Sequence, residues 1–246
     1  QRPEPERDSR KDIDAFFQAE ELLLKGYDPH LSKGAKTVGV PYALMMHKFF
    51  PMANAFFTEL GYRVLLSSPT NENTIAMAQS HARNETCYPV KLIYGHMLEL
   101  AERKVDYVFL PSIHTMKHET SKVRHNYGCV YMQTAPRLVF DELELEKKGI
   151  QLLNPVFDLD FGQEAMAQSM LQVGKRLGFG MEDCKRALMA GAAAVRRHTA
   201  ALEEQGRQVL SRLKPGEKAL VLIARNYGAA DPVLNMGIPK LIRERN

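Results

Sequence analysis

The sequence contains no tryptophan and only three cysteines in 246 residues. Such a low and odd number excludes the disulfide framework of a small secreted protein and indicates free thiols in a reducing compartment. No apolar run approaches the ~18 residues of a membrane-spanning helix, and residues 1–10 are too polar for a secretory signal. We therefore expect a cytoplasmic protein that does not act in a membrane.

Neither sign of charge is in large excess. The chain has 33 Lys and Arg residues against 29 Asp and Glu, a formal net charge of +4, and the basic residues are interspersed with acidic ones. This distribution argues against a nucleic-acid partner, which would require a concentrated basic surface. The charge distribution is compatible with a small anionic ligand. With 45% hydrophobic residues, a folded domain with its own core is expected.

Short apolar runs rich in β-branched residues alternate with segments of helical periodicity, which is typical of βαβ units. The predicted fold class is α/β, with a mostly parallel Rossmann- or flavodoxin-like sheet flanked by helices. A long helical hairpin, from helices at 163–177 and 181–213, leads into a second α/β unit. Strands or short extended segments are expected at residues 36–40, 62–67, 105–110, 130–133, 150–153 and 218–224.

These elements predict three parts. Residues 1–35 form an N-terminal helical arm, residues 36–158 an α/β domain that carries Cys87 and Cys129, and residues 159–246 the helical hairpin with the start of a second α/β lobe. The chain begins without a methionine and stops soon after an amphipathic segment starts. We expect it to be a fragment of a larger parent protein.

Cys87 precedes a segment with a clear helical pattern, TCYPVKLIYGHMLELA. Pro89 suits the first turn of that helix, where its missing N–H costs nothing. At a helix N-terminus the macrodipole and the free backbone N–H groups favour a thiolate, which is a good metal ligand or nucleophile. The alternative is a buried cysteine that packs as a small apolar side chain.

The other two cysteines have different settings. Cys129 is expected at a loop-to-strand junction after a long loop, residues 111–128, and the same two alternatives apply to it. Cys184 falls on the apolar stripe of a helix and is expected in the core. Because the sequence has no CxxC pair, the cysteines alone do not specify a zinc or iron–sulfur site, which commonly takes four ligands.

Four groups of residues form a recognisable set of motifs in order along the chain. They are VGVPYALMMHKFFPMANAFFTELGYRVLLSS at residues 38–68; Cys87, Tyr88 and Pro89 with Gly95 and His96; Cys129 with Gln133; and Arg225, Asn226 and Tyr227 followed by Asp231, Pro232, Gly237, Ile238 and Pro239. With this set the chain resembles a domain of unknown function found in acyl-CoA dehydratase activase-related proteins. These large proteins are related to the activators and cluster-bearing subunits of 2-hydroxyacyl-CoA dehydratases.

The resemblance implies a 4Fe-4S cluster held at the ends of strands by Cys87 and Cys129, in a protein that accepts or passes single electrons. It also implies two partners: the remainder of a larger chain with an ATPase activase domain, and an acyl-CoA dehydratase or reductase. The chain departs from the family pattern because no proline follows Cys129, and because Asn226 and Met236 stand where the family often has proline and histidine.

Four further residues are candidates for binding this cofactor. Lys91 and Arg225 supply positive charge, which tunes the potential of an anionic cluster. Tyr227 and Asp231 follow an expected strand, where α/β sheets usually bind ligands. The alternatives are ordinary solvated charges for the first pair and turn chemistry for Asp231.

Three functions remain open. The first is an iron–sulfur electron-transfer module related to the activator and cluster subunits of 2-hydroxyacyl-CoA dehydratases. The second is a cluster-free docking or regulatory domain of a larger activase-type protein. The third is a thiol-dependent acyl-CoA enzyme with Cys87 as nucleophile, although His96, nine residues further on, is more than two helical turns away and unsuited as its base.

Overall fold

The computed structural model describes residues 15–31, 34–82, 86–117, 120, 122, 125–217 and 220–244. Its first half alternates strands with helices. The elements there are α1 (Ala15–Leu23), β1 (Thr37–Val40), α2 (Met46–Glu59), β2 (Arg63–Leu66), α3 (Glu72–His81), α4 (Tyr88–Glu102), β3 (Tyr107–Phe109), β4 (Ser112–Thr115), α5 (Val130–Glu142), β5 (Gln151–Leu153) and β6 (Val156–Asp158). The second half is helical: α6 (Gly162–Arg176), α7 (Met181–Ser211), α8 (Asn226–Ala230) and α9 (Ile238–Glu244).

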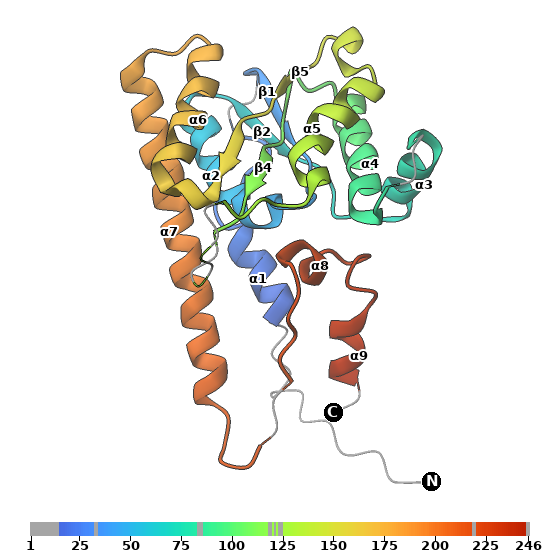
Figure 1. Ribbon diagram of the computed structural model, residues 1–246, viewed down its shortest axis with the longest axis vertical. Helices are drawn as coiled ribbons and strands as arrows, with labels where there is room; N and C mark the ends of the chain where they lie inside the picture. Colours follow the sequence, from blue (N-terminus) through green and yellow to red (C-terminus); the bar gives the residue numbers. More distant parts are fainter. Residues whose placement is uncertain are drawn as a thin grey trace.

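The central sheet is parallel and has the strand order β2-β1-β3-β5. This is the order of a flavodoxin-like doubly wound sheet, whose chain changes direction between β1 and β3. Helices α2, α6 and α7 lie on one side of the sheet and α3, α4 and α5 on the other (Figure 1). The expected α/β class with a mostly parallel sheet is therefore confirmed.

Two prolines interrupt the β3–β5 pair and create a second, two-stranded sheet. Beyond Pro111 and Pro155 the same two chain segments pair again as β4 and β6, also in parallel. Proline has no N–H to give to the ladder, and the Asn154 side chain fills part of the gap by donating to the Leu110 carbonyl at 2.7 Å. The expected long loop at 111–128 thus begins with the strand β4.

Helix α2 is the centre of the hydrophobic core. Phe50, Phe56 and Phe57 are fully buried, and the Phe57 ring meets the ring of Phe109 in β3 edge-on at 5.0 Å. On its other side α2 packs against the hairpin formed by α6 and α7, so it is covered on both faces. Such burial explains why this helix is apolar around most of its circumference.

The hairpin of α6 and α7 agrees with the sequence-based expectation, and Cys184 lies buried within it. Its sulfur faces Gly174 of α6 so closely that a Cβ at that glycine would come within 2.5 Å of it. Burial raises the pKa of the Cys184 thiol. The second half of α7 extends past the α/β body (Figure 1).

Two expected strands are wrong. Residues 130–133 form the first turn of α5, because a four-residue apolar run does not distinguish a strand from a buried helical turn. Residues 220–224 form no strand, and Leu220, Val221 and Ile223 are 72%, 77% and 90% exposed. Lys218 and Ala219, the start of the same expected strand, lie outside the described residues. Within the described chain, no second sheet therefore begins at this apolar segment.

Within the described ranges, no helix combines the length and the apolar character that crossing a bilayer requires.

Gly95 allows α3 and α4 to approach closely, since a Cβ there would lie 2.1 Å from the Thr74 carbonyl oxygen. We predict that Gly95→Ala lowers the free energy of unfolding by about 3 kcal/mol or more, because backbone must move to admit the methyl group. Gly206→Ala is the matched control: it faces open space on α7 and should raise that free energy by about 0.5–1 kcal/mol. Urea unfolding checks both, and equal effects would contradict the account.

Candidate functional site

The carboxyl edge of the sheet gathers the starts of α2, α4 and α5, because each crossover helix runs antiparallel to the strands. Cys87 is the N-cap residue of α4 and Cys129 that of α5, and both are exposed. The segment with α8 and α9 lies at the same edge (Figure 1). Both cysteines therefore occupy helix N-termini, as expected for Cys87. The expected loop-to-strand setting of Cys129 is wrong.

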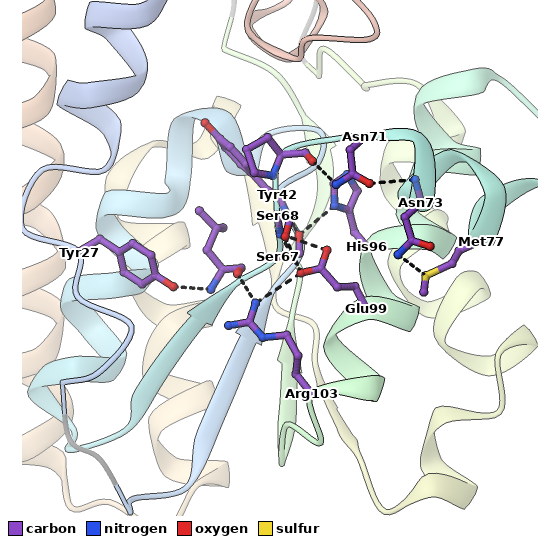
Figure 2. Close-up of polar contacts among 12 residues, drawn as sticks. Tyr27, Tyr42, Ser67, Ser68, Asn71, Asn73, Met77, His96, Glu99 and Arg103 are labelled. Atoms are coloured by element: carbon purple, nitrogen blue, oxygen red, sulfur yellow. Dashed lines mark hydrogen bonds and ion pairs between the residues drawn. The ribbon is translucent and has the colours of Figure 1, made fainter.

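A chain of buried hydrogen bonds crosses this edge from β1 to the C-terminal segment. The backbone N–H of Tyr42 donates to Ser67 Oγ at 2.8 Å, which lies 2.9 Å from Nδ1 of His96. On the other side of the ring, Nε2 lies 3.1 Å from Thr70 Oγ1, and the Thr70 hydroxyl donates to Asp231. Figure 2 shows the Ser67–His96 part of this chain at the end of β2.

The partners of His96 define its tautomer. A carboxylate only accepts, so the Thr70 proton is committed to Asp231, and Nε2 of His96 must donate to the Thr70 oxygen. Nδ1 then accepts from the Ser67 hydroxyl. Every member of the chain is satisfied only while His96 is neutral, in agreement with burial, which lowers its pKa to about 4.

Asp231 attaches the C-terminal segment to the α/β body. Its side chain is 2% exposed; one oxygen accepts from Thr70 and the other accepts the backbone N–H groups of Val233 and Leu234, both at 2.9 Å. Tyr227, four residues earlier, is also buried. A buried carboxylate is stable only with such donors around it. The segment is thus held to the sheet edge by a specific polar contact.

His47, in α2, is the second buried histidine near Asp231. Its ring stacks on Tyr42 with centroids 4.3 Å apart, and neither ring nitrogen has a hydrogen-bond partner within the described structure. Burial lowers its pKa to about 4, although the Asp231 charge opposes part of the shift. His47 is therefore neutral at neutral pH.

The end of β2 is tied to α4 by a second polar group (Figure 2). Both carboxylate oxygens of Glu99 accept the Ser68 N–H, at 2.9 and 3.1 Å, and Arg103 donates to the Leu66 carbonyl at 2.8 Å. Arg103 and Glu99 also form an ion pair at 3.5 Å. These contacts fix the strand end from which Ser67 and Thr70 project, and so fix the position of His96 relative to both.

Cys129 lines a cavity of about 410 Å³ at this edge. Lys48 of α2 and Met45, the N-cap residue of that helix, form one wall, and Arg225 and Asn226 form another. The Arg225 guanidinium Nη1 lies 3.3 Å from Met132 Sδ, in the first turn of α5, and 3.4 Å from the Tyr227 hydroxyl. A thiol at a helix N-terminus and two cationic side chains therefore share one cavity.

The structure separates the six residues predicted from the sequence into three groups. Cys129 and Arg225 share the cavity, with Tyr227 beside Arg225. Cys87 and Lys91 lie together in the first turn of α4 and do not line that cavity. Asp231 is buried and bonded to protein groups. Their roles as cofactor or metal ligands stay predictions.

The chain of buried hydrogen bonds was not identified from the sequence. His47, Lys48, Ser67 and Thr70 received no role, although Ser67 ends a predicted strand and Thr70 follows it, where parallel sheets place functional groups. His96 was identified only as part of the family motif with Gly95 and as an unsuited base for Cys87. Its contacts with Ser67 and Thr70 depend on how α4 crosses β2, which no local pattern encodes.

Within the described residues, no three His, Cys, Asp or Glu side chains come together in a way that would hold a metal ion. In comparisons with known proteins, the model of the family described as the CoA enzyme activase uncharacterised domain matches residues 37–246. The chain belongs to this family. Searches of curated proteins and of solved structures gave no significant match. The activase-related domain thus includes both exposed cysteines and the whole hydrogen-bonded chain.

We predict that the activase-related domain loses stability in mild acid. The folded pKa values of His47 and His96, about 4, lie below the ordinary 6.5. Between these values the unfolded chain binds more protons, so the free energy of unfolding falls with falling pH, by at most about 3 kcal/mol for each histidine. His47→Phe, which keeps the stacking on Tyr42, should flatten this profile in urea unfolding. An equally steep profile for this variant would contradict the assignment.

We also predict that Asp231→Ala releases the C-terminal segment. The variant leaves the Thr70 hydroxyl and two amides without their acceptor, a loss of about 2–3 kcal/mol, so trypsin should cleave after Arg225 at least about tenfold faster. Asp141→Ala is the control, because that carboxylate is in an exposed ion pair with Arg137 on α5. Equal cleavage rates in the two variants would show that Asp231 does not hold the segment.

Proposed function

We propose that this activase-related domain is an iron–sulfur electron-transfer module, with Cys87 and Cys129 as ligands of a 4Fe-4S cluster. One observation carries the proposal: the two exposed cysteines are both N-cap residues of helices at the carboxyl edge, whereas the third is buried in the core. A thiolate at a helix N-terminus is stabilised by the backbone N–H groups and the helix dipole.

The residues present fit such a cluster in chemistry and in part of its ligand number. Cys87 and Cys129 offer sulfur ligands, and Arg225 and Lys91 place positive charge near them. Among the described residues, no group of three His, Cys, Asp or Glu side chains could hold a metal ion. The other coordination positions would be filled from outside this part of the chain.

A bound cluster would supply one-electron chemistry, and the chain's own residues would hold it and adjust its charge environment. The source of the electron would be an ATPase activase domain of a larger parent chain. Its acceptor would be an acyl-CoA dehydratase or reductase. Both partners are proposals supported by the family description, and a cytoplasmic, reducing location is consistent with the free thiols.

A docking or regulatory role is the second candidate. It is favoured by Leu220, Val221 and Ile223, which are exposed and precede the residues that close the Cys129 cavity. Exposed apolar segments of this kind commonly mark interaction surfaces. This role needs no cluster. If the iron–sulfur proposal fails, the docking or regulatory role is therefore favoured.

The test is the iron and acid-labile sulfide content per chain after anaerobic reconstitution. We predict brown protein with about four irons for each cluster, whether one chain holds the cluster or several chains share it. We expect Cys87→Ser and Cys129→Ser each to lose the iron and the colour. Cys184→Ala is the matched control, because it removes a buried thiol; it should keep the native iron content. Iron that is absent from native protein, or that survives both serine variants, would exclude the proposal and favour the docking role.

A further inference from the structure

The cavity beside Cys129 carries an unbalanced charge. Lys48 and Arg225 are its only charged lining residues, and within the described structure no carboxylate lines it or forms an ion pair with either cation. The Lys48 ammonium lies 5.9 Å from the centre of the Phe49 ring. Among the described residues, the Arg225 guanidinium has polar contacts only with a thioether and a phenol, at 3.3 and 3.4 Å. The cavity is therefore positive.

Uncharged hydrogen-bond donors in the cavity also favour an anionic ligand. The side-chain nitrogen of Asn226, which lines the cavity, is buried and has no hydrogen-bond partner among the described residues. A buried donor without an acceptor is costly, so this amide favours a ligand with acceptor atoms. The N–H groups of Val130 and Tyr131, the first two residues of α5 and next to Cys129, have no acceptor within their own helix.

Three methionine side chains form an apolar part of the lining. Met45 and Met132 are 7% and 4% exposed, and Met116 lines the same cavity. The thioethers carry no charge of their own, and charge attraction is stronger beside such low-polarity surface than in bulk water. The arrangement thus combines positive charge, unpaired donors and walls that do not neutralise them.

We propose that this cavity is an anion-binding site in which Lys48, Arg225 and Asn226 hold a negatively charged ligand next to Cys129. Two sources share this chemistry: a phosphate group of a small ligand, and an anionic iron–sulfur cluster attached through Cys129. Only the second source rests on the proposed function. Lys48 lies within the first family motif, residues 38–68, but neither that motif nor the charge pattern of the sequence indicates that it binds a ligand.

Inorganic phosphate tests the site in metal-free protein, with thermal unfolding followed at constant ionic strength. Phosphate should stabilise the native chain, and Lys48→Gln or Arg225→Gln should raise the concentration that gives half the effect by about tenfold or more, the loss of one charge-assisted hydrogen bond. Lys104→Gln is the control, because Lys104 follows α4 at the opposite edge of the sheet; it should match the native chain. Equal phosphate responses in all four proteins would overturn the anion site.

Iron-loaded protein then distinguishes the source. If the cluster is the ligand, loading should abolish the phosphate response, and Lys48→Gln should shift the reduction potential to a more negative value, because the reduced cluster carries more negative charge. If native protein takes up no iron but keeps a Lys48-dependent phosphate response, the proposed function fails and the anion site stands with a phosphate ligand. If protein loads iron while Lys48→Gln changes neither potential nor phosphate response, the anion site is wrong and the cluster stands.

Discussion

The contact between Asp231 and Thr70 is the constraint on which the site depends. It joins a carboxylate in the C-terminal segment to a hydroxyl at the end of β2, and through that hydroxyl to the buried ring of His96 in α4. These groups come from three distant parts of the chain, and each is buried. A buried carboxylate requires donors, and Thr70 is the donor to Asp231 that belongs to the α/β body, so this contact holds the segment against the end of β2.

That position creates the cavity at Cys129. Arg225 lies six residues before Asp231 and reaches the first turn of α5 only because the segment between them lies on the sheet edge. Without this attachment, the cavity would lose the wall formed by Arg225 and Asn226. The buried hydrogen bonds of His96 and the position of Arg225 at the cavity are thus coupled, because both depend on the contact between Thr70 and Asp231.

The sequence was sufficient for the parts of the fold that depend on local patterns. Alternating strands and helices, the hairpin of α6 and α7, and the helix start at Cys87 follow from apolar periodicity and from Pro89. It failed at residues 130–133, where a four-residue run fits either structure, and at residues 220–224, whose apolar pattern has no partner in the described chain. The links from His96 to Thr70 and Asp231, and the approach of Lys48 to Cys129, depend on tertiary contacts between distant segments and have no local signal.

Hydrogen exchange of the native chain measures directly whether the C-terminal segment is held at the sheet edge. The amides of Val233 and Leu234 donate to Asp231 in the buried contact, whereas residues 220–224 are exposed and belong to no helix or strand. The account predicts that the two amides exchange as slowly as the amides of α4 and that residues 220–224 exchange at once. Equally fast exchange in both regions would show that the C-terminal segment is not held at the sheet edge and that Arg225 is not fixed beside Cys129.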